Sequence, residues 1–252
     1  MILLKTDKEI EILAESGKIL SFVLNTLLKK ADVGVNLLEL EQMARKMLKE
    51  AGAKPSFLGY QPEGADRPYS AALCLSLNSV VVHGIPRDYI LRSGDLLKID
   101  MGVVYEGMYT DSAVTVGIGK VSSIAKKLIV STRKSLEAAI SVAKKGGYLG
   151  DIGYAIERQA KKDGFKVLKG LTGHGVGYEV HEDPVILNYG KKGTGPELKE
   201  GMVLAIEPML SVSSEQIIQN RDESYSSADG SLTVQFEHTI VITKKGTVIL
   251  TK

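Results

Sequence analysis

The most constraining feature of the sequence is a pair of long strand patterns that face each other across a turn. Residues 96–105 and 108–116 are rich in apolar and β-branched side chains, and Glu106-Gly107 lies between them. A short loop of this kind, ending in glycine, is typical of a tight β-hairpin. The sequence therefore predicts an antiparallel hairpin with two long arms near the middle of the chain.

Helical and strand patterns alternate along the rest of the chain. Thr6 and Asn36 each have a glutamate three residues later, which is typical of the start of a helix, and apolar residues then recur at helical spacing. Further helices are expected over 122–145 and after Tyr148, and strands over 73–77, 80–82, 202–206 and 232–243. We interpret residues 1–252 as one domain of the α+β class, with helices packed on an antiparallel sheet.

The composition excludes several classes of protein. The 32 basic and 30 acidic residues leave a net charge of +2, too even to indicate a nucleic-acid or membrane-surface partner. The single cysteine excludes a disulfide framework and is compatible with a reducing compartment. The N-terminus lacks the pattern of a signal peptide, and no apolar run approaches the ~20 residues of a membrane span. We therefore expect a soluble, cytoplasmic protein.

Two aspartates of the predicted hairpin lie among apolar neighbours. If the loop has two or four residues, Gly102 lies opposite Asp111, and Asp100 is diagonal to Asp111 on the same face, roughly 7–8 Å away at the backbone. A one-residue shift in register would put the two carboxylates on opposite faces. Such a pair taken alone is more often a pair of surface aspartates. Facing carboxylates raise each other's pKa, however, and a bound cation removes that cost.

Three more residues extend this acidic set. Glu207 ends the apolar run 202–206, and buried carboxylates are rare unless they are paired or bound to a metal. Glu237 lies within the alternating run 232–243, on the face that carries Thr233 and Gln235. His174 is flanked by glycines, which let the backbone approach a site closely. Together the acids and the histidine suit two divalent cations better than a tetrahedral structural zinc.

Several separated motifs make the chain resemble the methionine aminopeptidases of the bacterial type. The resemblance extends over nearly the whole chain, and its motifs are Leu77-Asn78-Ser79-Val80-Val81-Val82-His83-Gly84-Ile85-Pro86, Lys98-Ile99-Asp100-Met101-Gly102 with Thr110-Asp111, Gly173-His174-Gly175-Val176-Gly177 through His181-Glu182-Asp183-Pro184, Ile206-Glu207-Pro208-Met209, and Gln235-Phe236-Glu237-His238-Thr239. It implies the pita-bread fold, a curved antiparallel sheet with two helix pairs on its outer face and pseudo-two-fold halves. It also implies removal of the initiator methionine from nascent proteins and peptides when the second residue is small.

The resemblance assigns roles to individual residues. It implies that two divalent cations (Co, Mn, Fe, Zn or Ni) are held by Asp100, Asp111, His174, Glu207 and Glu237. Such cations generate a hydroxide near neutral pH and polarise the scissile carbonyl. Glu207 is then the candidate general base, and His83 and His181 are the candidate groups that contact the substrate and the tetrahedral intermediate. The candidate residues of the substrate pocket are Phe57, Tyr60 and Cys74.

The chain departs from the family pattern around this pocket. Val180 stands just before the second histidine, where the family commonly has an aromatic residue. The loop from Gln61 to Ser70 is expected to be longer than in compact bacterial relatives. Tryptophan is absent, so Tyr225 is the candidate to replace any indole wall.

Two other functions share this fold. An X-Pro aminopeptidase or prolidase has the same metal ligands, but those chains usually carry a large extra N-terminal domain, and the sequence around His83 differs from theirs. A non-catalytic binding protein is expected to lose metal ligands, and all five are present. We expect a monomer whose partner is a peptide or nascent-chain N-terminus, with a transient ribosome contact at most, no membrane and no specific nucleic-acid site.

Overall fold

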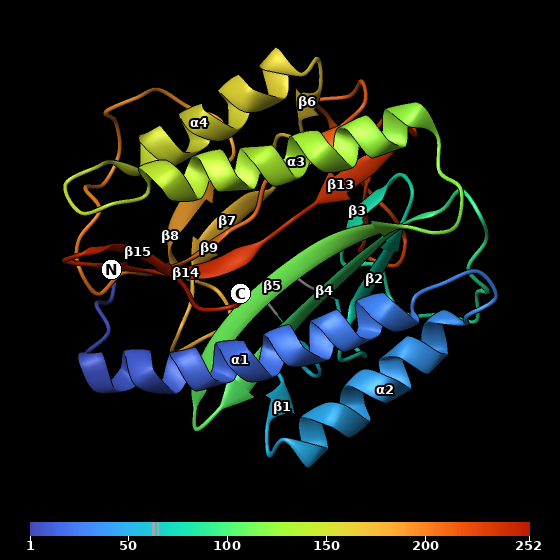
Figure 1. Cartoon of the computed structure of the whole chain (residues 1–252), viewed down its shortest axis with the longest axis horizontal. Helices are drawn as coiled ribbons and strands as arrows, with labels where there is room; N and C mark the ends of the chain where they lie inside the picture. The colour runs from blue at the N-terminus through green and yellow to red at the C-terminus, as the bar shows by residue number, and fades with distance from the viewer. Residues whose placement is uncertain (62–63, 65) are drawn as a thin grey trace.

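Two helix pairs flank the strands of the protein (Figure 1). The computed structural model describes residues 1–61, 64 and 66–252, and within them the helices are α1 (Asp7–Lys30), α2 (Leu37–Glu50), α3 (Ser123–Val142) and α4 (Leu149–Lys162). The first pair lies along one half of the molecule and the second pair along the other. This arrangement of helices on antiparallel sheets confirms the predicted α+β class.

The strands form short antiparallel sheets around one long hairpin. In chain order they are β1 (Lys54–Pro55), β2 (Cys74–Leu77), β3 (Val80–Val82), β4 (Leu96–Tyr105), β5 (Met108–Gly117), β6 (Lys166–Val167), β7 (Thr172–Gly175), β8 (Glu182–Leu187), β9 (Val203–Ile206), β10 (Met209–Ser211), β11 (Ile217–Gln219), β12 (Tyr225–Ser227), β13 (Thr233–Gln235), β14 (His238–Thr243) and β15 (Gly246–Ile249).

The helices begin where the sequence predicts. Thr6 and Asn36 cap α1 and α2, each in a reciprocal capping box with a glutamate three residues later, and the Ser122 hydroxyl caps α3. The end of α3 differs from the prediction, because the helix stops at Val142 rather than at residue 145. The chain turns there, and Gly146 takes a φ of 83° that glycine adopts at little cost.

The central hairpin has the predicted register. β4 and β5 pair along their whole length, with Gly102 opposite Asp111. Glu106 and Gly107 both have positive φ, 48° and 79°, which is the geometry of a two-residue hairpin turn that matches the twist of the strands. Asp100 and Asp111 therefore share one face of the hairpin.

The run 232–243 is not the single strand that alternation predicts. It breaks after Gln235 into β13, which pairs with β10, and β14, which pairs with β9. The segment that pairs with it breaks at the same level, because Glu207 and Pro208 separate β9 from β10. Proline has no backbone N–H to donate to a neighbouring strand. Glu207 and Glu237 thus both lie at breaks, where regular pairing gives way and the backbone can redirect a side chain.

Side-chain hydroxyls join the two halves along a seam between β5 and the segment 233–239. Ser112 Oγ donates to the carbonyl of Glu237 at 2.7 Å, and Thr115 Oγ1 donates to the carbonyl of Gln235 at 2.6 Å. Across the same seam, Thr239 Oγ1 donates to the carbonyl of Asp111 at 2.7 Å. The backbone N–H of Glu237 also donates to the carbonyl of Ala113 at 2.8 Å. The seam is therefore held mainly by hydroxyls, with one backbone bond, in place of a continuous backbone ladder.

Each helix pair covers its own apolar core. Leucines of α1 and α2 pack on the hairpin and β2, whereas α3 and α4 pack on residues of β9, β13 and β14. In the described part of the chain, no helix has the length and apolar character needed to cross a membrane. The site lies between these two cores.

Candidate active site

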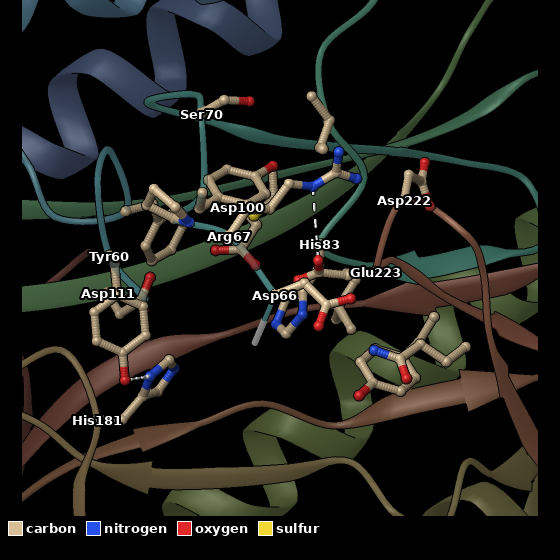
Figure 2. Close-up of a pocket in the computed structure, with 18 of the residues that line it drawn as sticks. Tyr60, Asp66, Arg67, Ser70, His83, Asp100, Asp111, His181, Asp222 and Glu223 are labelled. Atoms are coloured by element: carbon tan, nitrogen blue, oxygen red, sulfur yellow. Dashed lines mark hydrogen bonds and ion pairs between the residues drawn. The ribbon is translucent and has the colours of Figure 1, made fainter. Parts of the chain in front are cut away.

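A cavity of about 530 Å³ opens between the two halves (Figure 2). Every residue that the sequence marked for the site lines it: Phe57, Tyr60, Cys74, His83, Asp100, Asp111, His174, His181, Glu207, Tyr225 and Glu237. Asp100 and Asp111 come from the hairpin, His174 from β7, and the two glutamates from the broken strands. The fold therefore gathers residues that are up to 180 positions apart in the sequence into one cavity.

The ligand atoms at the floor of the cavity are close enough to share a cation. One ligand atom from each of Asp111, His174 and Glu237 lies within 4.8 Å of the others, and all three residues are buried. Glu207 Oε1 lies 3.5 Å from His174 Nε2. Asp100 lies beside Asp111 on the shared hairpin face. These distances suit a compact metal site rather than a set of independent acids.

The four carboxylates are in an environment that opposes their negative charge. Burial raises the pKa of Asp100 to about 7, and burial together with neighbouring carboxylates raises the pKa of Asp111, Glu207 and Glu237 well above the usual range. Among the described residues, Asp100 Oδ1, Asp111 Oδ1 and Glu237 Oε1 are buried without a hydrogen-bond partner in the protein. Such oxygens are costly unless a cation meets them, so the residues fit divalent metal ions.

His174 is prepared as a neutral ligand. Its Nδ1 donates to the carbonyl of Gly175 at 2.9 Å, which leaves the Nε2 lone pair directed at the acids. Burial lowers the pKa of His174 to about 4. A neutral imidazole of fixed orientation is the form that binds metals.

The two other histidines of the cavity lie around this cluster. His181 Nδ1 is 2.9 Å from the Tyr60 hydroxyl (Figure 2). The His181 ring also packs edge-on against His174, with the two ring centroids 4.5 Å apart. Part of the His181 ring faces the open cavity, but burial of the rest lowers its pKa, and His174 adds to this effect. His83 has a φ of 61°, and its ring packs against the Tyr225 ring with the two centroids 5.7 Å apart. Both rings remain neutral near pH 7 and can donate or accept one proton.

One wall of the cavity is apolar and aromatic. Phe57, Cys74 and Val180 are buried together, with Tyr60, Tyr69 and Tyr109 packed against them. Val180, which stands where the family commonly has an aromatic residue, is thus part of the support behind the wall. The predicted long loop 61–70 includes residues 62, 63 and 65, which lie outside the described residues, so its length stays a prediction.

Two residues that organise the site, Gln235 and Tyr69, were not predicted to belong to it. Gln235 Nε2 donates to Glu207 Oε2 at 3.1 Å and so fixes one oxygen of that carboxylate. Its position two residues before Glu237, on the same face of an alternating run, was the available signal. Tyr69 donates its hydroxyl to the carbonyls of Leu73 and Gly84, both at 3.0 Å, and no local pattern indicates this.

A buried glutamate on α2 anchors the segment that forms the aromatic wall. The Glu41 carboxylate accepts the backbone N–H of Ala72 at 2.8 Å and of Leu73 at 3.0 Å. It also accepts from Arg45, which in turn donates to the carbonyl of Ser70 at 3.1 Å. The amphipathic pattern of α2 gives no sign of this contact.

Replacement of Glu41 by alanine is expected to destabilise the protein by about 3 kcal/mol, because two buried amides lose a charged acceptor. Urea unfolding followed by circular dichroism measures this loss. Glu50→Ala, at the exposed end of the same helix, removes only a surface contact with Lys46 and is expected to change stability by less than ~0.5 kcal/mol. Equal effects of the two variants would contradict the anchoring role.

Known proteins are similar to this chain over most of its length. The model of metallopeptidase family M24 matches residues 11–244. The chain is 44% identical to a methionine aminopeptidase of Aquifex aeolicus, over 99% of this chain and 98% of that protein. It superposes on the crystal structure of a methionine aminopeptidase from Thermotoga maritima with a TM-score of 0.96 and 40% identity, covering all of both chains.

A more distant structure shares the fold alone. The prolidase of Pyrococcus horikoshii superposes with a TM-score of 0.78 and 24% identity, and the chain covers 64% of it. The helix pairs, the antiparallel sheets and the buried acids are thus set in the fold that the sequence predicted. The chain belongs to metallopeptidase family M24, within its methionine aminopeptidases.

Proposed function

We propose that this protein removes the N-terminal methionine of peptides and nascent proteins whose second residue is small. The observation that carries the proposal is the buried cluster of acids and His174 at the floor of a cavity with an aromatic wall. Full-length similarity to proteins named methionine aminopeptidase supports the choice of substrate. An acidic floor also favours a free α-amino group, which only the end of a peptide offers.

We assign the cluster to two divalent cations. Asp100, Asp111 and Glu237 would hold one, and His174 and Glu207 would complete the other. When bound, divalent cations activate water as a nucleophile near neutral pH and polarise a carbonyl oxygen. The donor set of oxygens and one imidazole accepts Co, Mn, Fe, Zn or Ni, and cellular supply selects among them.

The remaining steps are assigned to side chains around the cluster. Glu207 would take the proton of the attacking water, while Gln235 holds the other oxygen of its carboxylate in place. Because Tyr60 engages His181 Nδ1, Nε2 of His181 is left to contact the oxygen of the scissile amide. His83, across the cavity, would lie near the leaving nitrogen.

The aromatic wall would receive the methionine side chain. Phe57, Tyr60 and Cys74 line the cavity next to the acids, and Tyr69 meets Phe57 edge-on with centroids 6.4 Å apart. A thioether packs favourably against aromatic edges, which suits methionine better than a charged residue.

Peptide cleavage tests the proposal directly. Metal-loaded protein is expected to release methionine from peptides that begin Met-Ala or Met-Gly, and to leave peptides that begin Ala-Pro intact. Amino-acid analysis of the products measures both reactions. Cleavage of X-Pro peptides without release of methionine would contradict the proposal, and full activity after exhaustive chelation would contradict the role of the metal ions.

We also propose the setting in which the reaction takes place. The single cysteine suits a reducing compartment, so we place the protein in the cytoplasm. The substrate would be a peptide or nascent-chain N-terminus, met by a monomer through no more than a transient ribosome contact. The near-zero net charge gives no reason to add a membrane or a specific nucleic-acid site.

A further inference from the structure

His181 lies in the connection between β7 and β8, and the carboxylate of Glu182 binds backbone groups of that connection. Glu182 Oε1 accepts the backbone N–H of Tyr178 and, at 3.0 Å, that of Glu179. His181 lies between these amides and the glutamate that binds them. The Glu182 side chain therefore closes a short loop around the backbone of His181.

A lysine from the segment before α1 fixes the other oxygen of that carboxylate. Lys5 Nζ forms an ion pair with Glu182 Oε2, and the two side chains are only 1% and 8% exposed. This is the most buried lysine–carboxylate pair in the part of the chain that the structure describes. A pair with so little solvent screening is stronger than one on the surface.

The packing around Lys5 leaves it little freedom. Its ammonium lies 4.6 Å from the centroid of the Tyr178 ring. Its stem passes over Gly177, where an added Cβ would come within 2.3 Å of Lys5 Cε, and Gly177 has a φ of 145°. The backbone N–H of Lys5 donates to the carbonyl of Gly201 at 2.8 Å. The lysine is therefore clamped at both its backbone and its charged end.

We propose that the Lys5–Glu182 ion pair is a positioning device for His181. It holds the connection 177–182 so that the imidazole meets Tyr60 on one side and lies against His174 on the other. Without the pair, Glu182 keeps its contacts to the two loop amides but loses the anchor that fixes them to the body of the protein. The inference rests on the proposed peptidase function, because His181 acts there on the substrate.

Steady-state kinetics of Lys5→Met, which keeps the length of the apolar stem and removes the charge, tests the inference. We expect kcat for a Met-Ala peptide to fall about 10- to 100-fold, since displacement of a contacting group by about 1 Å has effects of that size. We expect KM to change less than about threefold, because the loss falls on the transition state. Glu182→Gln keeps an oxygen for the loop amides, breaks the same pair, and is expected to give the same split.

Double variants separate positioning from general destabilisation. In a His181→Ala background, Lys5→Met is expected to cause no further fall in kcat, because residues that act through one another are not additive. The combination of Lys5→Met and Glu182→Gln is expected to resemble either single variant. The matched control is Lys18→Met on α1, which removes an exposed ion pair with Glu15 and leaves kcat unchanged.

Some results would overturn the inference. They are an unchanged kcat in Lys5→Met, a change in KM alone, or an equal loss of kcat with and without His181. If Lys5→Met is less stable, thermal melts give its folded fraction, and kcat is then expressed per folded molecule. Glu182→Gln disrupts the same ion pair and serves as a second variant. Failure of the unaltered protein to release methionine would instead reject the proposed function, so the two failures are distinguishable.

Discussion

The replacement Glu207→Gln is expected to lower kcat for methionine release by about 10³-fold, the typical contribution of a positioned general base. The change is nearly isosteric, so Gln235 can still hydrogen-bond to the carbonyl oxygen of the new side chain. What disappears is the proton acceptor and one negative charge beside His174. The loss is measured with a Met-Ala peptide at saturating divalent cation, so that weaker metal binding does not limit the rate.

Stability provides the matched readout for this variant. Burial raises the pKa of Glu207, so the metal-free fold gains nothing from its charge, and Glu207→Gln is expected to unfold at the same temperature or a higher one. Glu197→Gln, an exposed glutamate away from the cluster, is expected to retain full activity. A variant at position 207 that keeps more than about a tenth of the activity would reject the role of this residue as the base.

The second large effect concerns the stability of the metal-free protein, which is expected to decrease as the pH rises from about 5 to about 8. The folded pKa of Asp100, about 7, lies above its usual value of 3.8. Between these two pKa values, the folded state binds more protons than the unfolded state. The stability that protonated Asp100 contributes is therefore fully present at low pH and is lost as the pH rises through about 7. Asp100 alone lowers the free energy of unfolding by up to about 1.4 kcal/mol for each pH unit in this range. The pKa values of the neighbouring acids are also raised, so these acids act in the same direction.

Divalent cations are expected to reverse this trend. They bind the charged carboxylates of the folded state, and at one hundred times Kd they add about 2.7 kcal/mol of stability. Thermal melts with chelator and with manganese, at a series of pH values, measure both effects. Asp100→Asn is expected to flatten the pH dependence in chelator, whereas Glu11→Gln on the exposed face of α1 is expected to leave it unchanged. A metal-free protein that becomes more stable between pH 5 and 8 would contradict the prediction.

Local patterns predicted those parts of the site that depend on short-range geometry. The sequence left open a hairpin loop of two or four residues, but either length, together with the period of a strand, places Asp100 on the same face as Asp111. The helix starts at Thr6 and Asn36 follow from capping groups three residues apart. In each case, the contact that decides the structure lies within a few residues of the pattern.

Other features depend on contacts between distant segments. Alternation over 232–243 predicted one strand because periodicity does not report which neighbour a residue pairs with, and the neighbour here breaks at Pro208. In the sequence, Glu41 and Lys5 both look like ordinary solvent-facing residues. Glu41 nevertheless binds a loop more than 30 positions away, and Lys5 binds one more than 170 positions away. Only the folded chain shows that these charges are buried.

The seam of hydroxyls between β5 and the segment 233–239 has a thermodynamic consequence. The hairpin supplies Asp100 and Asp111 from one side of this seam, and His174, Glu207 and Glu237 come from the other. Cations that bridge these groups would therefore link the unfolding of the two cores, each of which has its own helix pair. In such a molecule, the metal ions also act as a cross-link between the two cores. The two cores would then unfold together when the ions are bound and more independently when they are absent.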